Sequence, residues 1–76
     1  MGASFEYLDI DGDVLVIGAR GAIRRKHAAP FAAVQLGTEH GEEQTGVLIR
    51  VDDVDKVIEA LQRAKSESQR LFDAGV

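Results

Sequence analysis

The first two thirds of the chain contain short apolar runs, and the last third repeats its apolar residues with a period near 3.6. Residues 5–10 and 13–17 are rich in aromatic and β-branched residues, which favour strands. Between them lies Asp11-Gly12, a dipeptide typical of a two-residue hairpin turn, because glycine accepts the positive φ that the turn requires. The pattern therefore predicts an N-terminal β-hairpin.

The register of this predicted hairpin gives it two apolar faces. A two-residue turn places Ile10 opposite Asp13 and Leu8 opposite Leu15. One face then carries Leu8, Ile10, Leu15 and Ile17, and the other carries Phe5, Tyr7, Val14 and Val16. A hairpin with one face in water normally alternates apolar and polar residues. We therefore expect Phe5, Tyr7, Val14 and Val16 to lie in an interface.

Three further strands are predicted after the first. The second spans about 13–24, with a bulge or bend at Gly18–Gly21, because glycine inside a strand usually marks one. His27–Pro30 reads as a connection, since proline does not fit a central strand or a helix interior. Strands at about 31–38 and 45–51 follow, joined by a polar turn near His40-Gly41-Glu42. The alanines within 31–36 leave a helix possible there.

The C-terminal segment gives the clearest pattern. Its apolar residues fall at i, i+3 and i+4 positions on one stripe, namely Val54, Val57, Ile58, Leu61, Ala64, Leu71 and Phe72, as in an amphipathic helix. Asp52 or Asp53 is expected to cap a helix over about 53–72. Exposed pairs of Glu59 with Arg63 and of Arg63 with Glu67 add slight support. We predict one α+β domain over 1–76: an antiparallel sheet of about four strands, in β-β-β-β-α order, packed against one C-terminal amphipathic helix.

The predicted helix is too long for the predicted strands. Twenty helical residues span about 30 Å, whereas a five-residue strand spans about 17 Å. The helix end, with Leu71 and Phe72, is therefore expected to reach beyond its own sheet. Together with the two-faced hairpin, this mismatch predicts a homodimer whose interface includes Leu71 and Phe72.

Composition narrows the function classes. The 76 residues carry a net charge of −4 and contain no cysteine, which excludes disulfides and thiolate metal sites and makes nucleic acid an unlikely partner. No apolar run approaches the ~20 residues of a membrane span, and the first residues lack the basic and apolar regions of a signal peptide. We expect a protein without a membrane contact, located in the cytoplasm.

One segment is basic although the chain as a whole carries a net negative charge. It comprises Arg20, Arg24, Arg25, Lys26 and His27. Clustered guanidinium groups suit carboxylate and phosphate oxygens, so this segment is the candidate ligand-binding site. The alternative is a charged strand end that prevents unwanted edge pairing. In a dimer, the segment is also placed to meet the acidic residues 39–43 of the second copy.

Catalytic, cofactor and metal motifs are incomplete. Residues 13–21 resemble the opening strand and glycine turn of dinucleotide-binding Rossmann domains, but Arg24 stands at the third glycine position. Gly18–Gly21 also fits the short loop of KH nucleic-acid-binding domains, yet it follows a strand. Residues 9–13 fail the calcium-loop spacing, and neither histidine has the ligand spacing of a metal site. We expect no cofactor, no metal and no enzyme activity.

The predicted function is therefore binding. The first hypothesis is a small non-enzymatic, homo-oligomeric protein–protein interaction module, of the kind that bacteria or phages use as accessory proteins. The alternative is a protein that binds a small anionic ligand, such as a nucleotide or phosphorylated metabolite, through residues 20–27. A response of thermal stability to such ligands separates the two hypotheses.

Overall fold

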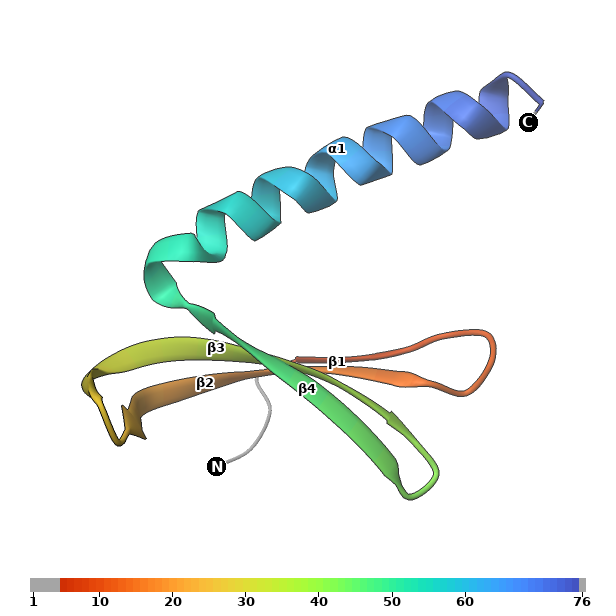
Figure 1. Ribbon diagram of the computed structural model, residues 1–76. Coiled ribbons are helices and arrows are strands. Elements are labelled where there is room, and N and C mark those ends of the chain that lie inside the picture. The colour runs from red at the N-terminus through yellow and green to blue at the C-terminus, as the bar shows by residue number, and fades with distance from the viewer. Residues whose placement is uncertain (1–4, 76) are drawn as a thin grey trace.

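The computed structural model describes residues 5–75 and consists of one sheet followed by one long helix (Figure 1). The predicted domain, 1–76, extends beyond the described residues at both ends. The elements are β1 (Phe5–Leu8), β2 (Val14–Arg25), β3 (Ala28–His40), β4 (Glu43–Arg50), the 3₁₀ turn η1 (Val51–Asp53) and α1 (Val54–Asp73). The four strands pair antiparallel in the order β1-β2-β3-β4. The predicted α+β class and order of elements are confirmed, and residues 31–36 are strand.

The turn between β1 and β2 is one residue longer than predicted. Asp9 N–H donates to the Asp13 carbonyl at 2.9 Å, and Gly12 N–H donates to the Asp9 carbonyl at 3.3 Å. Gly12 has φ of +88°, as in a three-residue loop that ends in a left-handed glycine. One Asp9 carboxylate oxygen also accepts the N–H groups of Asp11 and Asp13, each at 2.9 Å. This carboxylate closes the longer loop, which a two-residue reading of Asp11-Gly12 misses.

The longer loop shifts the hairpin register by one residue and corrects the predicted faces. Leu8 lies opposite Val14 and Tyr7 lies opposite Leu15. Because a shift by one moves side chains to the other side of the sheet, Phe5 and Tyr7 do not share a face with Val14 and Val16. Those four residues were predicted to form one surface, and that prediction is wrong.

The register of all four strands defines two unlike faces, since residues directly opposite each other point to the same side. The apolar face comprises Phe5, Tyr7, Leu15, Ile17, Ala19, Val34, Leu36, Val47 and Ile49, with Thr38 and Thr45 beside them and His40 and Glu43 next to the β3–β4 turn. The mixed face comprises Glu6, Leu8, Val14, Val16, Gly18, Arg20, Ala33, Gln35, Gly37, Glu39, Gln44, Gly46, Leu48 and Arg50. Only one face of the sheet is therefore mainly apolar, and its polar residues lie near the β3–β4 turn.

Pro30 lies inside β3, which corrects the expectation of a connection at this point. Pairing between β3 and β4 starts at Ala33 opposite Arg50, so β3 has β2 alone as its neighbour around Pro30. A proline without an N–H group is tolerated where one side of a strand has no partner. The register of β2 and β3 also shifts between Arg20 and Ile23, which places the predicted irregularity at the end of Gly18–Gly21.

The helix begins one residue later than predicted and ends one residue later. Asp53 occupies the N-cap position, but its side chain makes no capping hydrogen bond and instead lies 3.3 Å from the Lys56 ammonium. Glu59 pairs with Arg63 at 2.8 Å, as predicted. Glu67 pairs with Arg70 rather than with Arg63.

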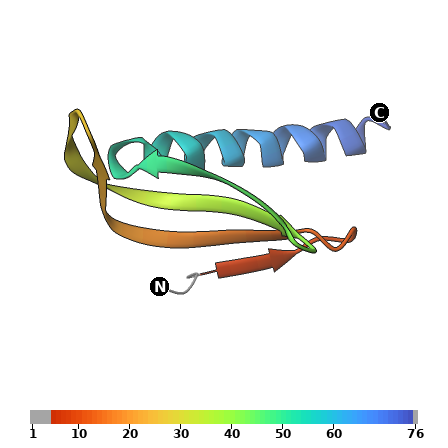
Figure 2. The same ribbon diagram turned by 60° about the horizontal axis from the view of Figure 1, so that its bottom comes forward.

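The helix meets the sheet only near its start. Val54 and Val57 are half-buried, whereas every residue from Ile58 to Arg70 is exposed. The side view shows α1 running alongside the strands and ending beyond them (Figure 2). The buried apolar residues among those described are Ile23 and Ala33. The predicted packing along the sheet is thus absent over most of the helix, and the described residues form almost no apolar core.

Candidate functional site

The most prominent surface of the chain is the apolar face of the sheet. Tyr7 is 58% exposed and Val47 is 60% exposed, and Phe5 and Leu15 are exposed as well. Towards the centre of the sheet, Ile17, Val34, Leu36 and Ile49 are half-buried. Singly exposed apolar residues are common on proteins, but contiguous ones mark a binding surface. The exposed residues here come from β1, β2 and β4 and form one face.

A second apolar surface runs along α1. Leu61 is 64% exposed and Phe72 is 77% exposed, and Ile58 is exposed between the half-buried start of the helix and Leu61. These residues continue the stripe that begins at Val54 and Val57. Leu71, also predicted to lie in an interface, is half-buried. The helix therefore presents apolar side chains over most of its length.

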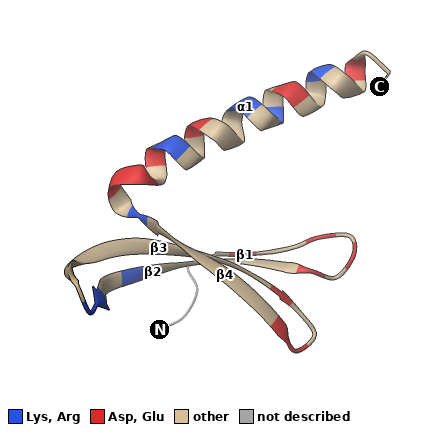
Figure 3. Cartoon of the chain, viewed as in Figure 1, with Lys and Arg blue, Asp and Glu red and all other residues tan. Residues whose placement is uncertain are grey.

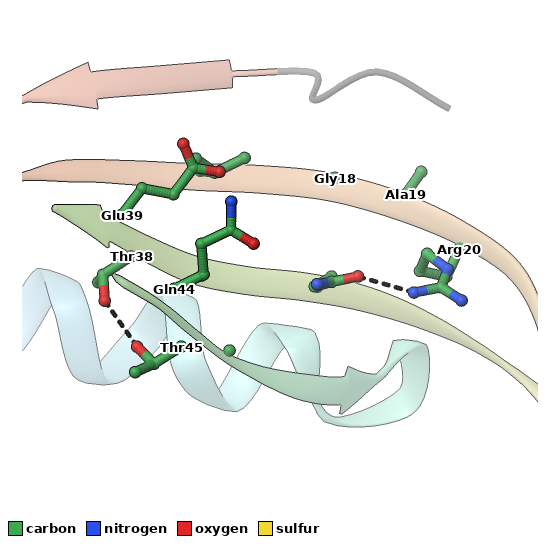
Figure 4. Close-up of a pocket in the computed structure, with 11 residues that line it drawn as sticks. Gly18, Ala19, Arg20, Thr38, Glu39, Gln44 and Thr45 are labelled. Atoms are coloured by element: carbon green, nitrogen blue, oxygen red, sulfur yellow. Dashed lines mark hydrogen bonds between the residues drawn. The ribbon is translucent and has the colours of Figure 1, made fainter. Parts of the chain in front are cut away.

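The two apolar surfaces lie on the same side of the molecule. Figure 4 looks onto the mixed face, where Glu39, Gln44 and Arg20 are labelled, and α1 passes behind the sheet. The helix is therefore on the side of the apolar face, and Figure 1 shows it diverging from the strands. We call these two surfaces together, the apolar face and the α1 stripe, the open clamp.

Charged residues gather at opposite ends of the sheet (Figure 3). The basic end is the turn between β2 and β3, with Arg24, Arg25, Lys26 and His27 all exposed. The acidic end holds the other two turns, with Asp9, Asp11, Asp13, Glu39, Glu42 and Glu43. The ribbon places both acidic turns at the end far from the basic turn.

The predicted ligand site does not converge on one point. Arg20 lies on the mixed face, where its guanidinium donates to Gln35 Oε1 at 2.7 Å. Arg24 and Arg25 lie at the turn, and the Arg25 guanidinium donates to the Arg24 carbonyl at 3.4 Å. The structure thus separates Arg20 from the other cations and leaves the latter open to solvent. Anion binding by this segment stays a prediction.

A shallow hollow of about 380 Å³ lies on the mixed face and includes Arg20. Three glycines of neighbouring strands, Gly18, Gly37 and Gly46, leave its floor without side chains (Figure 4). Gly37 is needed for the sheet itself, because a Cβ at this position would lie 2.9 Å from the Thr45 carbonyl oxygen. The hollow is therefore explained by close strand pairing.

The acidic end contains one contact that the sequence did not predict. His40 Nδ1 contacts the Asp13 carboxylate across the β2–β3 pair. Both side chains are substantially exposed, so water competes with the interaction. Within residues 5–75, no group of three or more histidine or acidic side chains is arranged to hold a metal ion.

Two side-chain contacts could not be predicted from the spacing of apolar residues alone. The Arg50 guanidinium lies 3.9 Å from the centre of the Phe31 ring, a stabilising cation–π contact where β4 leads into η1. On the helix, the Arg70 guanidinium donates to Glu67, with 2.9 Å between Arg70 Nε and Glu67 Oε2. This hydrogen bond lowers the pKa of Glu67 and raises that of Arg70. Both groups are exposed and belong to the outer side of the helix.

The helix of the described region lacks the run of apolar residues that a membrane-crossing helix requires. Searches against protein-family models, curated proteins and solved structures each return no match for this chain.

Proposed function

We propose that this chain is a non-enzymatic protein–protein interaction module that works as a homodimer. The observation that carries the proposal is the open clamp. Tyr7 and Val47 on the sheet and Leu61 on the helix are all more than half exposed, although they belong to the two surfaces that an α+β domain normally buries against each other. A second copy supplies the missing apolar partner for both surfaces.

The dimensions of the chain support this proposal. Its radius of gyration is 15.5 Å, whereas a compact domain of this length has about 11 Å. Its accessible surface is 6366 Å², and a compact monomer of this mass exposes about 4,500 Å². The excess, about 1,800 Å², exceeds the roughly 800 Å² that each partner buries in a standard interface. One additional copy is large enough to cover it.

The distribution of polar groups favours binding over catalysis. Most charged residues of the sheet lie at its turns, Glu6, Arg20 and Arg50 lie on its mixed face, and the charged residues of α1 are exposed. Catalytic acids and bases usually lie in clefts where burial shifts their pKa values, and the pKa shifts found here belong to the exposed helix pair Glu67 and Arg70.

A chain without cysteine fits the reducing cytoplasm, which we propose as its location.

The stability of the chain tests this proposal. If the folded state is a dimer, its thermal unfolding midpoint must rise with protein concentration. A hundredfold increase in concentration corresponds to about 2.7 kcal/mol, which shifts the midpoint of a domain of this size by several degrees. Calorimetry of the full chain at about 5 and about 500 μM measures the shift. A midpoint independent of concentration contradicts the proposal.

A further inference from the structure

The charge arrangement assigns an orientation to the second copy. At one end of the sheet, the β1–β2 and β3–β4 turns and the adjoining strand ends carry six carboxylates, those of Asp9, Asp11, Asp13, Glu39, Glu42 and Glu43. At the other end, the β2–β3 turn exposes Arg24, Arg25 and Lys26 in succession. Figure 3 shows the two ends separated along the direction of the strands. The sheet therefore has one acidic end and one basic end.

We propose that the second copy packs into the open clamp with its strands antiparallel to those of the first copy. This inference rests on the proposed homodimer. The acidic end of each copy then faces the basic end of its partner, and the two-fold axis makes this contact twice. Complementary charges of this kind set the orientation of an interface and disfavour the alternatives. A parallel arrangement would place six carboxylates of one copy against six of the other.

The partner that fits these features is a second copy rather than an unrelated protein. The surface carries positive charge at one end of an apolar area and negative charge at the other, so two copies of it are complementary. A two-fold dimer requires a self-complementary surface of this kind. The excess exposed area is also large enough for a standard interface with one partner chain. The basic turn thus acts as an orienting contact.

Cysteine cross-linking tests the orientation, because the natural chain contains no cysteine. Glu42→Cys and Lys26→Cys place one thiol at the acidic and one at the basic end, both in exposed turns. With a short bis-maleimide, a mixture of the two variants is expected to cross-link at least tenfold faster than either variant alone. β3 alone spans 13 residues, roughly 40 Å at about 3.3 Å per residue, so like ends lie far apart in the antiparallel dimer.

The results of the cross-linking experiment test the antiparallel orientation separately from dimerisation itself. If either variant alone cross-links as fast as the mixture while sedimenting as a dimer, the antiparallel orientation is overturned and the proposed function stands. If all samples sediment as single chains, the proposed function fails, and the orientation fails with it.

Charge reversal gives a second, independent readout. Arg24→Glu with Arg25→Glu is expected to weaken dimerisation at least tenfold at low salt. Adding Asp11→Lys, Glu39→Lys, Glu42→Lys and Glu43→Lys to the same chain makes the former acidic end net positive. This change should restore self-association to within about threefold of the natural chain, because each end again meets an opposite charge. This fully reversed chain should not form mixed dimers with the natural chain. Efficient mixed dimers would overturn the antiparallel arrangement.

Discussion

Replacing Tyr7 by aspartate is expected to convert the dimer into single chains. Tyr7 lies on the apolar face opposite Leu15 and is 58% exposed in the single chain. The substitution is therefore expected to leave the fold of the single chain intact. In the dimer, the new carboxylate would be buried without a partner, which is strongly unfavourable. We expect the dissociation constant to rise at least 100-fold, or about 2.7 kcal/mol, as measured by sedimentation equilibrium.

The matched control for this substitution is Leu8→Asp on the same strand. Leu8 is even more exposed than Tyr7, but it lies opposite Val14 on the mixed face. The same change of chemistry should therefore alter the dissociation constant by no more than about threefold, a surface effect within 0.5–1 kcal/mol. If Leu8→Asp dissociates the dimer as strongly as Tyr7→Asp, the apolar face is not the interface.

The helix stripe gives the second large effect. Leu61 lies in the middle of the stripe and is 64% exposed, and Leu61→Asp is expected to raise the dissociation constant at least 30-fold. The physical reason is the loss of a buried leucine together with the burial of a charge. Fluorescence anisotropy of a labelled chain during dilution measures this constant.

Ser66→Asp controls for the effect of an aspartate within the helix. Ser66 is exposed and lies five residues from Leu61, on the other side of the helix. Both variants carry the small loss of helix propensity that aspartate brings, but Ser66→Asp should leave the dissociation constant within about twofold. Equal effects of the two variants would mean that the helix stripe contacts nothing in the assembly.

The strongest local patterns predicted the elements well. The helix over Val54–Asp73 follows from seven apolar residues at helical spacing, and it begins and ends within one residue of the predicted limits. The turn near Gly41 was also predicted, and Gly41 has φ of +61° between the paired residues His40 and Glu43. In both cases the residues that determine the conformation are neighbours in the sequence.

Other features depend on contacts that periodicity does not reveal. The hairpin register is set by the Asp9 carboxylate, which accepts two backbone N–H groups, and a turn dipeptide alone predicts a loop shorter by one residue. Pro30 fits in β3 because β4 has already ended beside it, which requires the strand order. The sequence also predicted that the helix packs on the sheet, whereas every residue from Ile58 to Arg70 is exposed, because the spacing of apolar residues does not determine how far a helix follows its sheet.

The mass of the chain in solution tests the central claim most directly. Sedimentation equilibrium of the full chain at micromolar concentration is predicted to give twice the chain mass of 8.2 kDa, because the single chain exposes about 1,800 Å² more surface than a compact monomer would. The value should fall towards one chain on dilution and in Tyr7→Asp. A mass of 8.2 kDa for the natural chain at these concentrations would contradict the homodimer and, with it, the proposed function.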